Sequence, residues 1–273
     1  MQTRVVPRTG EPLPCVGLGT WQAFDVGTSA EERAPRAEVL RVLFEAGGRV
    51  IDSSPMYGRA EQVVGDLLRA SRHPAPFLAT KVWTTGREEG IAQMEESIRR
   101  MAAPGRIDLM QVHNMVDVDT HLATLRRWKE DGRIRYVGVT HYARSAFDAM
   151  ERLIRSELVD FVQLPYSAAS RDAEARLLPA AADHRTAVLV MRPFEEGGLL
   201  RLVHGKPLPR WASEAGAATW AELFLRWILG HPAVTCPVPA TSNPAHAREN
   251  VRAGEGPPLD PAQRRRLVAE LGL

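Results

Sequence analysis

The 273-residue chain has 44% hydrophobic and 25% charged residues, a globular composition that excludes a disordered, collagen-like or coiled-coil protein. Its 35 basic and 33 acidic residues give a net charge of +2, too small an excess to indicate a nucleic-acid partner. No apolar run reaches the roughly 18 residues that span a bilayer, and the first residues lack the apolar stretch of a signal peptide. The two cysteines, Cys15 and Cys236, are too few for a disulfide framework, so we expect a reducing compartment, the cytoplasm.

Short apolar runs alternate along the chain with longer stretches of helical spacing. Eight of these runs are predicted strands, and most begin about 25 to 35 residues apart, the length of a strand–helix unit. They are Val16–Gly19, Val50–Asp52, Phe77–Val82, Ile107–Val112, Ile134–Val139, Val159–Leu164, Ala187–Met191 and Ala233–Val238.

The stretches that follow the strands repeat apolar residues every three or four positions, which predicts helices. Ahead of the first strand, Arg4–Leu13 places a turn between two extended stretches, which predicts a hairpin that closes the bottom of a barrel. The predicted helices are Ala37–Ala46, Glu61–Ala70, Ile91–Met101, His121–Trp128, Ala146–Ile154, Ala173–Ala182, Trp220–Leu229 and Ala245–Val251, with Pro261–Leu271 as an additional terminal helix.

Eight strands that are each followed by a helix predict a closed parallel (β/α)8 TIM barrel. The alternative is an open doubly wound sheet, which often begins on a glycine-rich phosphate loop. Gly17 and Gly19 are not followed by a third glycine at the right spacing, which favours the barrel. No internal linker interrupts the chain, so residues 1–273 are expected to form a single domain.

Four polar residues gather at or near the predicted carboxyl ends of three consecutive strands, the face on which barrels hold their active sites. Asp52 ends the second strand, Tyr57 lies in the loop after it, Lys81 is in the third strand and His113 follows the fourth. Each residue alone is ordinarily structural: a cap, a packing ring, a solvated cation or a hydrogen-bonded imidazole. Their joint occurrence at one mouth indicates a site.

These residue types suit proton donation by a phenol. A cation at Lys81 would lower the pKa of Tyr57 from its usual value of about 10, and Asp52 would keep Lys81 charged and in position. His113 would orient a carbonyl oxygen or relay a proton. Tyr57 would be the general acid for an oxygen that becomes negative, as when a carbonyl receives hydride. No side chain supplies hydride, so this chemistry requires a nicotinamide cofactor.

The sequence resembles the aldo-keto reductases from about Pro12 to Arg252. The resemblance implies a (β/α)8 fold, hydride transfer from nicotinamide to a carbonyl carbon, and a catalytic tetrad of Asp52, Tyr57, Lys81 and His113 with Tyr57 as the proton donor. The matching motifs are Val16–Trp21, Ile51–Gly58, Ala79–Trp83, Gln111–Asn114, Gly132–Val139 and Thr241–Pro244.

The resemblance also implies a dinucleotide that lies across the barrel mouth without a Rossmann motif. Gln163 stands where the family holds the carboxamide, and Met191 where many members stack an aromatic residue on the nicotinamide. Thr140 and His141 replace residues that are often Ser and Asn. The implied cofactor-binding residues are Gly19, Thr20, Trp21, Thr140, His141, Gln163, Met191, Arg192, Pro193, Phe194, Thr241, Ser242, His246, Glu249 and Asn250.

Two positions bear on the choice between NADPH and NADH. Ala240 and His246 stand where NADPH-specific members often have a Lys and an Arg for the 2′-phosphate. The hydroxyls of Thr241 and Ser242, with a helix N-terminus, remain able to bind phosphate, and Asn250 matches the adenine-contacting position. We expect NADPH with weakened discrimination, and NADH remains possible.

On the substrate side, the resemblance implies contacts from Trp21, Trp83, His113 and Asn114, the last replacing what is often an aromatic residue. Gly197–Ala218 is expected to act as a lid or clasp, or to form a short packed helix. The pocket is expected to be open and permissive because little chain follows the final helix.

The expected activity is reversible reduction of small aldehydes or ketones by a monomer, with no metal, nucleic acid or membrane partner. Two alternatives remain open. One is a cofactor-binding regulatory protein of the same fold with little or no turnover. The other is a barrel enzyme with different chemistry, such as a lyase.

Overall fold

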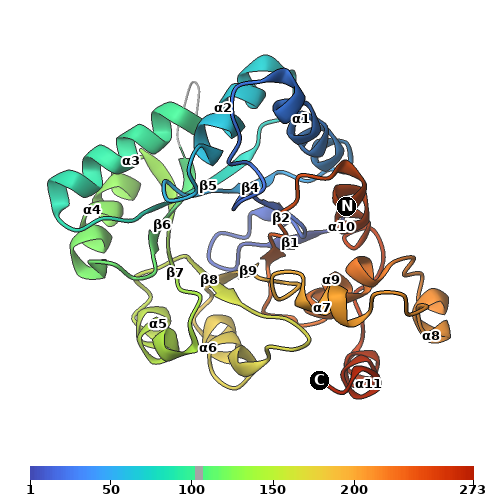
Figure 1. Ribbon diagram of the computed structural model, residues 1–273. Helices are drawn as coiled ribbons and strands as arrows, with labels where there is room; N and C mark the ends of the chain where they lie inside the picture. The colour runs from blue at the N-terminus through green and yellow to red at the C-terminus, as the bar shows by residue number, and fades with distance from the viewer. Residues whose placement is uncertain (102–106) are drawn as a thin grey trace.

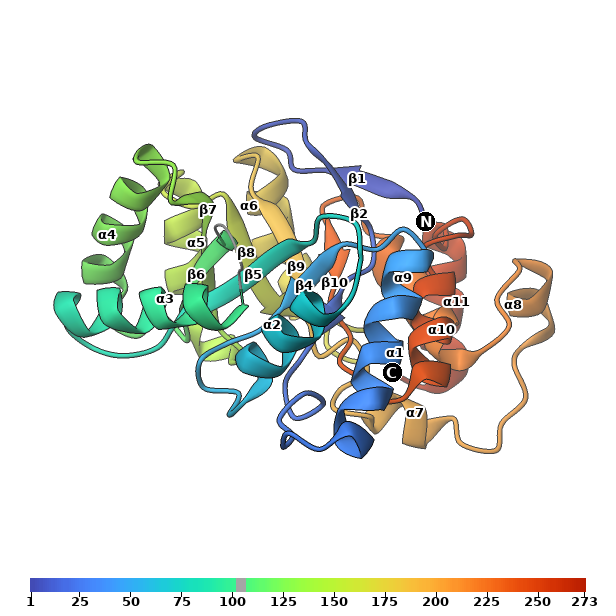
Figure 2. The same cartoon turned by 90° about the horizontal axis from the view of Figure 1, so that it is seen from above.

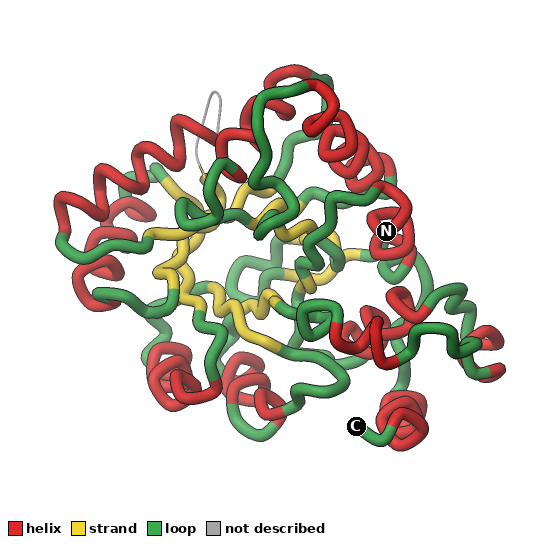
Figure 3. Tube along the Cα trace, viewed as in Figure 1, coloured by secondary structure: helices red, strands yellow, loops and turns green. Residues whose placement is uncertain are grey.

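The computed structural model describes residues 1–101 and 107–273, and its centre is an eight-stranded parallel sheet in the order β10-β9-β8-β7-β6-β5-β4-β3. The two end strands meet, because Gly19 forms a parallel bridge with Ala240 and the Gly17 N–H donates to the Pro237 carbonyl over 3.0 Å. The predicted closed barrel is therefore confirmed over the open sheet (Figures 1 and 3). The strands are β3 Leu18–Gly19, β4 Val50–Asp52, β5 Phe77–Val82, β6 Ile107–His113, β7 Ile134–Thr140, β8 Phe161–Pro165, β9 Ala187–Met191 and β10 Cys236–Pro237.

The helices surround this barrel (Figure 3), and several begin earlier than apolar spacing predicts. The first starts at Ala30 rather than Ala37, because Ser29 caps it by accepting the Glu32 N–H; a polar first turn carries no apolar signal. Within the described residues, no helix is long and apolar enough to cross a membrane. The helices are α1 Ala30–Glu45, α2 Ala60–Ala70, α3 Arg87–Met101, α4 Val118–Glu130, α5 Phe147–Arg155, α6 Leu177–Asp183, α7 Gly198–Leu202, α8 Arg210–Glu214, α9 Trp220–Leu229, α10 Pro244–Arg252 and α11 Pro261–Leu271, with 3-10 turns η1 Arg144–Ala146 and η2 Asp172–Glu174.

The interior of the barrel changes from apolar to polar along its axis. Side chains of a strand alternate between its two faces, so β5 points Phe77, Ala79 and Lys81 to the same side, and β8 does the same with Phe161 and Gln163. Phe77 and Phe161 pack with centroids 6.0 Å apart inside a buried cluster that also includes Ala79. Aromatic rings thus fill the amino end of the barrel. The polar residues that point inward from the same strands, Lys81 and Gln163, lie at the carboxyl end.

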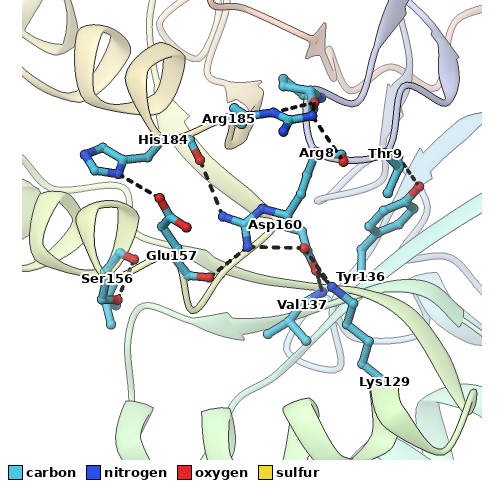
Figure 4. Close-up of polar contacts among 12 residues, drawn as sticks. Arg8, Thr9, Lys129, Tyr136, Val137, Ser156, Glu157, Asp160, His184 and Arg185 are labelled. Carbon is cyan, nitrogen blue, oxygen red and sulfur yellow. Dashed lines mark hydrogen bonds and ion pairs between the residues drawn. The ribbon is translucent and has the colours of Figure 1, made fainter.

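The predicted hairpin is present as β1 Thr3–Val5 and antiparallel β2 Pro12–Pro14. Figure 2 shows it at the end of the barrel opposite α7. In Figure 4, Arg8 of the hairpin turn reaches the loops beneath the strands, where its guanidinium donates to the carbonyls of Glu157 (2.8 Å) and His184 (3.4 Å). It also lies 3.8 Å from the Asp160 carboxylate. These contacts fasten the hairpin across the amino end of the barrel.

Asp160 is the buried centre of this contact network. Its carboxylate accepts the Val137 N–H over 2.9 Å and two hydrogen bonds from Lys129 Nζ at 2.7 and 2.8 Å. Replacing Asp160 with alanine leaves the buried Val137 N–H without a partner, so we expect the free energy of unfolding to fall by about 2–3 kcal/mol. Urea denaturation measures the change.

The control for this prediction is Asp148→Ala. Asp148 also pairs with an arginine, Arg176, but both side chains are more than half exposed, and such pairs contribute about 0–1 kcal/mol. If both variants lost the same free energy of unfolding, Asp160 would contribute no more to stability than an exposed ion pair does.

Candidate functional site

A buried ion pair lies at the polar end of the barrel. Lys81 on β5 places its Nζ 2.9 and 2.8 Å from the two carboxylate oxygens of Asp52, the last residue of β4, and 2.6 Å from the Ser53 carbonyl. The same carboxylate accepts the side-chain amides of Gln111 (3.2 Å) and Gln163 (2.9 Å). Burial, the largest single effect, disfavours the ammonium, but the charge and hydrogen bonds of Asp52 together with smaller contributions from other acidic groups raise the pKa of Lys81 overall. The pair is therefore charged and held by hydrogen bonds from neighbouring strands.

Tyr57 lies over this pair, in the loop between β4 and α2. Its ring centroid is 5.1 Å from Lys81 Nζ, and its N–H donates to the Ser54 carbonyl over 3.0 Å in a tight turn. Burial raises the pKa of Tyr57 more than the Lys81 ammonium lowers it, so the net shift is upward. The expectation that Lys81 brings this pKa below its usual value is wrong for the free protein, because desolvation of a phenolate is the larger effect. The hydroxyl accordingly stays protonated.

His113, the last residue of β6, packs its ring nearly perpendicular to that of Tyr57 with centroids 5.7 Å apart. Its Nδ1 lies 2.9 Å from the Ser54 hydroxyl. Burial, followed by the nearby Lys81 ammonium and His141, lowers the pKa of His113 to about 2. The imidazole is thus neutral at physiological pH, and it offers one N–H donor and one acceptor.

These residues meet at a cavity of about 400 Å³ at the carboxyl end of the strands. Exposed apolar side chains stand at the mouth, with exposed fractions of 42% for Trp21, 37% for Met56 and 48% for Tyr142. The predicted site residues that line the cavity are Gly19, Thr20, Trp21, Asp52, Tyr57, His113, Asn114, Gln163, Met191, Arg192, Pro193 and Phe194.

Five predicted site residues lie outside the lining of this cavity and of the adjoining one described below. Lys81 is buried behind Asp52, and Trp83 stands with its ring 6.5 Å from that of His113. The others are Thr140, His141 and Ser242. The roles given to them by resemblance stay predictions.

A second cavity, of about 340 Å³, adjoins the first and shares Phe194 and Ala240 with it. Its lining includes four residues predicted to hold the cofactor: Thr241, His246, Glu249 and Asn250. It also includes residues of the 197–218 segment and α9 that sequence reasoning did not single out, among them His204, Lys206 and Trp220. The segment folds into two short helices, α7 and α8, so the expectation of a short helix is correct for 198–202.

Lys206 differs from the other lysines of the chain. The sequence holds three, and Lys81 and Lys129 each pair with a buried aspartate. Across residues 1–101 and 107–273, the structure gives Lys206 Nζ no such partner, although the backbone of Lys206 is fixed by the indole N–H of Trp220, which donates to its carbonyl over 2.9 Å. The sequence has 32 arginines and only three lysines. This rarity of lysine could have drawn attention to Lys206 as a candidate binding residue.

Tyr142 and Glu196, at the rim of the first cavity, were also missed, although Arg192, which contacts both, was predicted to bind the cofactor. Arg192 places its guanidinium 4.9 Å from the Tyr142 ring centroid and pairs with Glu196 at 3.0 Å. Arg192, Glu195 and Glu196 all have positive φ, between 50° and 53°, a conformation that side-chain-bearing residues rarely adopt. The path of the chain around the mouth is therefore set by tertiary contacts that local sequence does not reveal.

Comparison with known proteins places this geometry in context. The profile of the Aldo/keto reductase family matches residues 15–269. The chain is 29% identical over 259 residues to methylglyoxal reductase YeaE of Escherichia coli (strain K12), a match that covers 92% of this chain and 89% of that protein.

Solved structures agree in fold. A crystal structure of an aldo/keto reductase from Klebsiella pneumoniae in complex with NADP and acetate superposes with a TM-score of 0.82 at 28% identity, covering 98% of this chain and 96% of that one. A second Klebsiella pneumoniae structure, in complex with NADPH, has a TM-score of 0.79 at 28% identity and covers 98% and 95% of the two chains.

Proposed function

The chain belongs to the aldo/keto reductase family, and on that premise we propose that it reduces aldehyde or ketone carbonyls to alcohols with NADPH, Tyr57 being the proton donor. The observation that supports this most is a protonated phenol and a neutral imidazole side by side in one cavity, above a buried Lys81–Asp52 pair. A regulatory protein without turnover would not need a proton donor placed beside His113 and above the Lys81–Asp52 pair.

The residues present fit a nicotinamide dinucleotide. Gln163 Oε1 is buried, has no hydrogen-bond partner within the described part of the chain, and belongs to a side chain that lines the first cavity. It suits the amide N–H of a carboxamide, because a buried acceptor is ordinarily satisfied. Two adjoining cavities also suit the two halves of a dinucleotide, and the relatives from Klebsiella pneumoniae are titled as complexes with NADP and NADPH.

The cofactor, when bound, supplies hydride to the carbonyl carbon. The hydroxyl of Tyr57 then donates its proton to the carbonyl oxygen as negative charge develops there. The Lys81 ammonium, 5.1 Å from the phenol ring, stabilises the phenolate that remains, and Asp52 keeps Lys81 charged. Solvent at the open mouth returns the proton to Tyr57, which completes the conversion of carbonyl, hydride and proton into an alcohol.

The substrate class follows from the cavity. Trp21, Met56 and Tyr142 give the mouth exposed apolar surface, and the two charged side chains at its rim, Arg192 and Glu196, pair with each other at 3.0 Å, which suits small uncharged carbonyl compounds. A first panel would contain methylglyoxal, the substrate in the name of the Escherichia coli relative, with benzaldehyde and aliphatic aldehydes and ketones.

The proposal is tested by following the loss of NADPH absorbance with each member of this panel. We expect turnover of at least one aldehyde above the rate without carbonyl. Tight binding of NADPH with no turnover of any carbonyl would instead support a regulatory protein.

Lys206 is expected to set the preference for NADPH over NADH. Among the described residues that line the second cavity it is the only Lys or Arg, and Glu249 is the only carboxylate. A charge-assisted hydrogen bond to the 2′-phosphate would favour NADPH. We expect Lys206→Ala to weaken NADPH binding about tenfold and to change NADH binding less than about twofold, as measured by nicotinamide fluorescence or calorimetry.

The matched control is Arg248→Ala, which removes a cation of α10 that pairs with Glu38 at 2.6 Å and lies outside the cavity lining. It should leave both affinities unchanged. A Lys206→Ala variant that loses equal affinity for both dinucleotides would count against recognition of the 2′-phosphate by this lysine.

A further inference from the structure

Ser54 joins the two residues proposed to act on the carbonyl oxygen. It is fully buried, its hydroxyl oxygen lies 2.9 Å from His113 Nδ1, and its carbonyl accepts the N–H of Tyr57 over 3.0 Å. The hydroxyl also accepts the N–H of Met56 over 3.3 Å. One side chain thus contacts the imidazole and the turn that carries the phenol.

The protons of this contact can be assigned by counting. A serine hydroxyl has one proton to donate and two lone pairs that accept. The Met56 N–H occupies one lone pair, and among the described residues His113 Nδ1 is the only acceptor within hydrogen-bond distance of the hydroxyl. A buried hydroxyl without an acceptor costs free energy, so we infer that the Ser54 hydroxyl donates its proton to His113 Nδ1.

The protonation of His113 agrees with this assignment. A neutral imidazole carries a single proton, and burial keeps this ring neutral. If Nδ1 accepts from Ser54, the ring proton must reside on Nε2.

We propose that Ser54 is a positioning residue that holds His113 in the Nε2–H tautomer, so that the imidazole donates a hydrogen bond to the carbonyl oxygen that Tyr57 protonates. This rests on the proposed carbonyl reduction. Two donors then meet one oxygen, which favours the negative charge that develops there. The opposite tautomer would turn a lone pair of Nε2 toward that oxygen and repel it.

The test is a Ser54→Ala variant studied by nitrogen NMR of protein labelled with ¹⁵N-histidine, in the absence of substrate and at neutral pH. The signals of His113 are identified by their loss in His113→Gln. In the wild type we expect the protonated-nitrogen shift on Nε2 and the unprotonated shift on Nδ1. In Ser54→Ala we expect the two tautomers to mix, and kcat for the best substrate to fall about tenfold with the affinity for NADPH unchanged.

Ser53→Ala is the matched control. Ser53 is the neighbouring residue and equally buried, but its hydroxyl accepts from Thr20 over 2.9 Å, whereas His113 Nδ1 is paired with Ser54. This variant should keep the wild-type tautomer.

The inference is overturned if wild-type His113 carries its proton on Nδ1, or if Ser54→Ala alters neither the tautomer nor kcat. These outcomes are separate from failure of the proposed function. A protein with the expected tautomer that reduces no carbonyl contradicts the proposed function, whereas an active protein with the other tautomer contradicts the role of Ser54.

Discussion

Replacing Tyr57 with phenylalanine is expected to lower kcat for carbonyl reduction about 10³-fold. The change removes only the hydroxyl, so the ring keeps its packing against His113 and its place above Lys81. General acid catalysis typically contributes 10²–10⁴-fold. Among the described residues, two other hydroxyls line this cavity: that of Thr20, which is engaged with the Asp52 carbonyl and the Ser53 hydroxyl, and that of Tyr142, which stands at the exposed rim. Steady-state loss of NADPH absorbance at saturating substrate measures the effect.

The affinity of Tyr57→Phe for NADPH is the internal control and should match that of the wild type. Turnover by the variant at a rate equal to the wild type would rule out Tyr57 as the proton donor. In the wild type, reduction needs the protonated phenol, and burial raises the pKa of Tyr57 above its usual value of about 10. The rate should therefore persist across neutral pH and fall only as the pH rises through that raised pKa.

Replacing Lys81 with methionine is expected to damage both activity and stability. The side chain is 1% exposed and its Nζ makes three hydrogen bonds, two to Asp52 and one to the Ser53 carbonyl. Removing it leaves the buried Asp52 carboxylate without a cation, which typically costs about 3–5 kcal/mol. We expect a loss of that size in the free energy of unfolding, measured in urea, and a fall in kcat of at least about 100-fold.

The double variant Asp52→Asn with Lys81→Met separates the two effects. It removes both charges, so we expect most of the lost stability to return, while kcat stays low because no ammonium remains to stabilise the Tyr57 phenolate. A double variant that regains activity along with stability would show that the pair has a structural role alone.

Much of the barrel could be predicted from local patterns. The apolar runs at Phe77–Val82 and Ala187–Met191 coincide with β5 and β9, and the helices at Trp220–Leu229 and Pro261–Leu271 have the predicted bounds. These segments are long or strongly periodic, and periodicity is the signal that sequence carries most directly. The shortest strands were predicted too long: Ala233–Val238 is reduced to Cys236–Pro237, because pairing depends on the neighbouring strand.

The position of the proposed proton donor, Tyr57, could also be predicted from the sequence. The direction in which its pKa shifts could not. Asp52, Lys81 and His113 stand at strand ends, and the two-residue alternation of strands sends their side chains to one mouth. The sequence suggested that Lys81 lowers the pKa of Tyr57, but the depth at which the phenol lies reverses the net shift. Burial is a property of the packed molecule, since it depends on segments far apart in the chain.

The sequence by itself determined the barrel, its hairpin and the identity of the four residues at the mouth, because these follow from periodicity and from the order of residues along each strand. Only the tertiary structure decided that Ser54 contacts His113, that Lys206 lines the second cavity beside α10, and that Arg192 stacks on Tyr142. Each of these contacts joins residues separated by some 40 to 60 positions or lies on a loop. Such contacts depend on how loops pack against the finished barrel, and no local pattern in the chain encodes them.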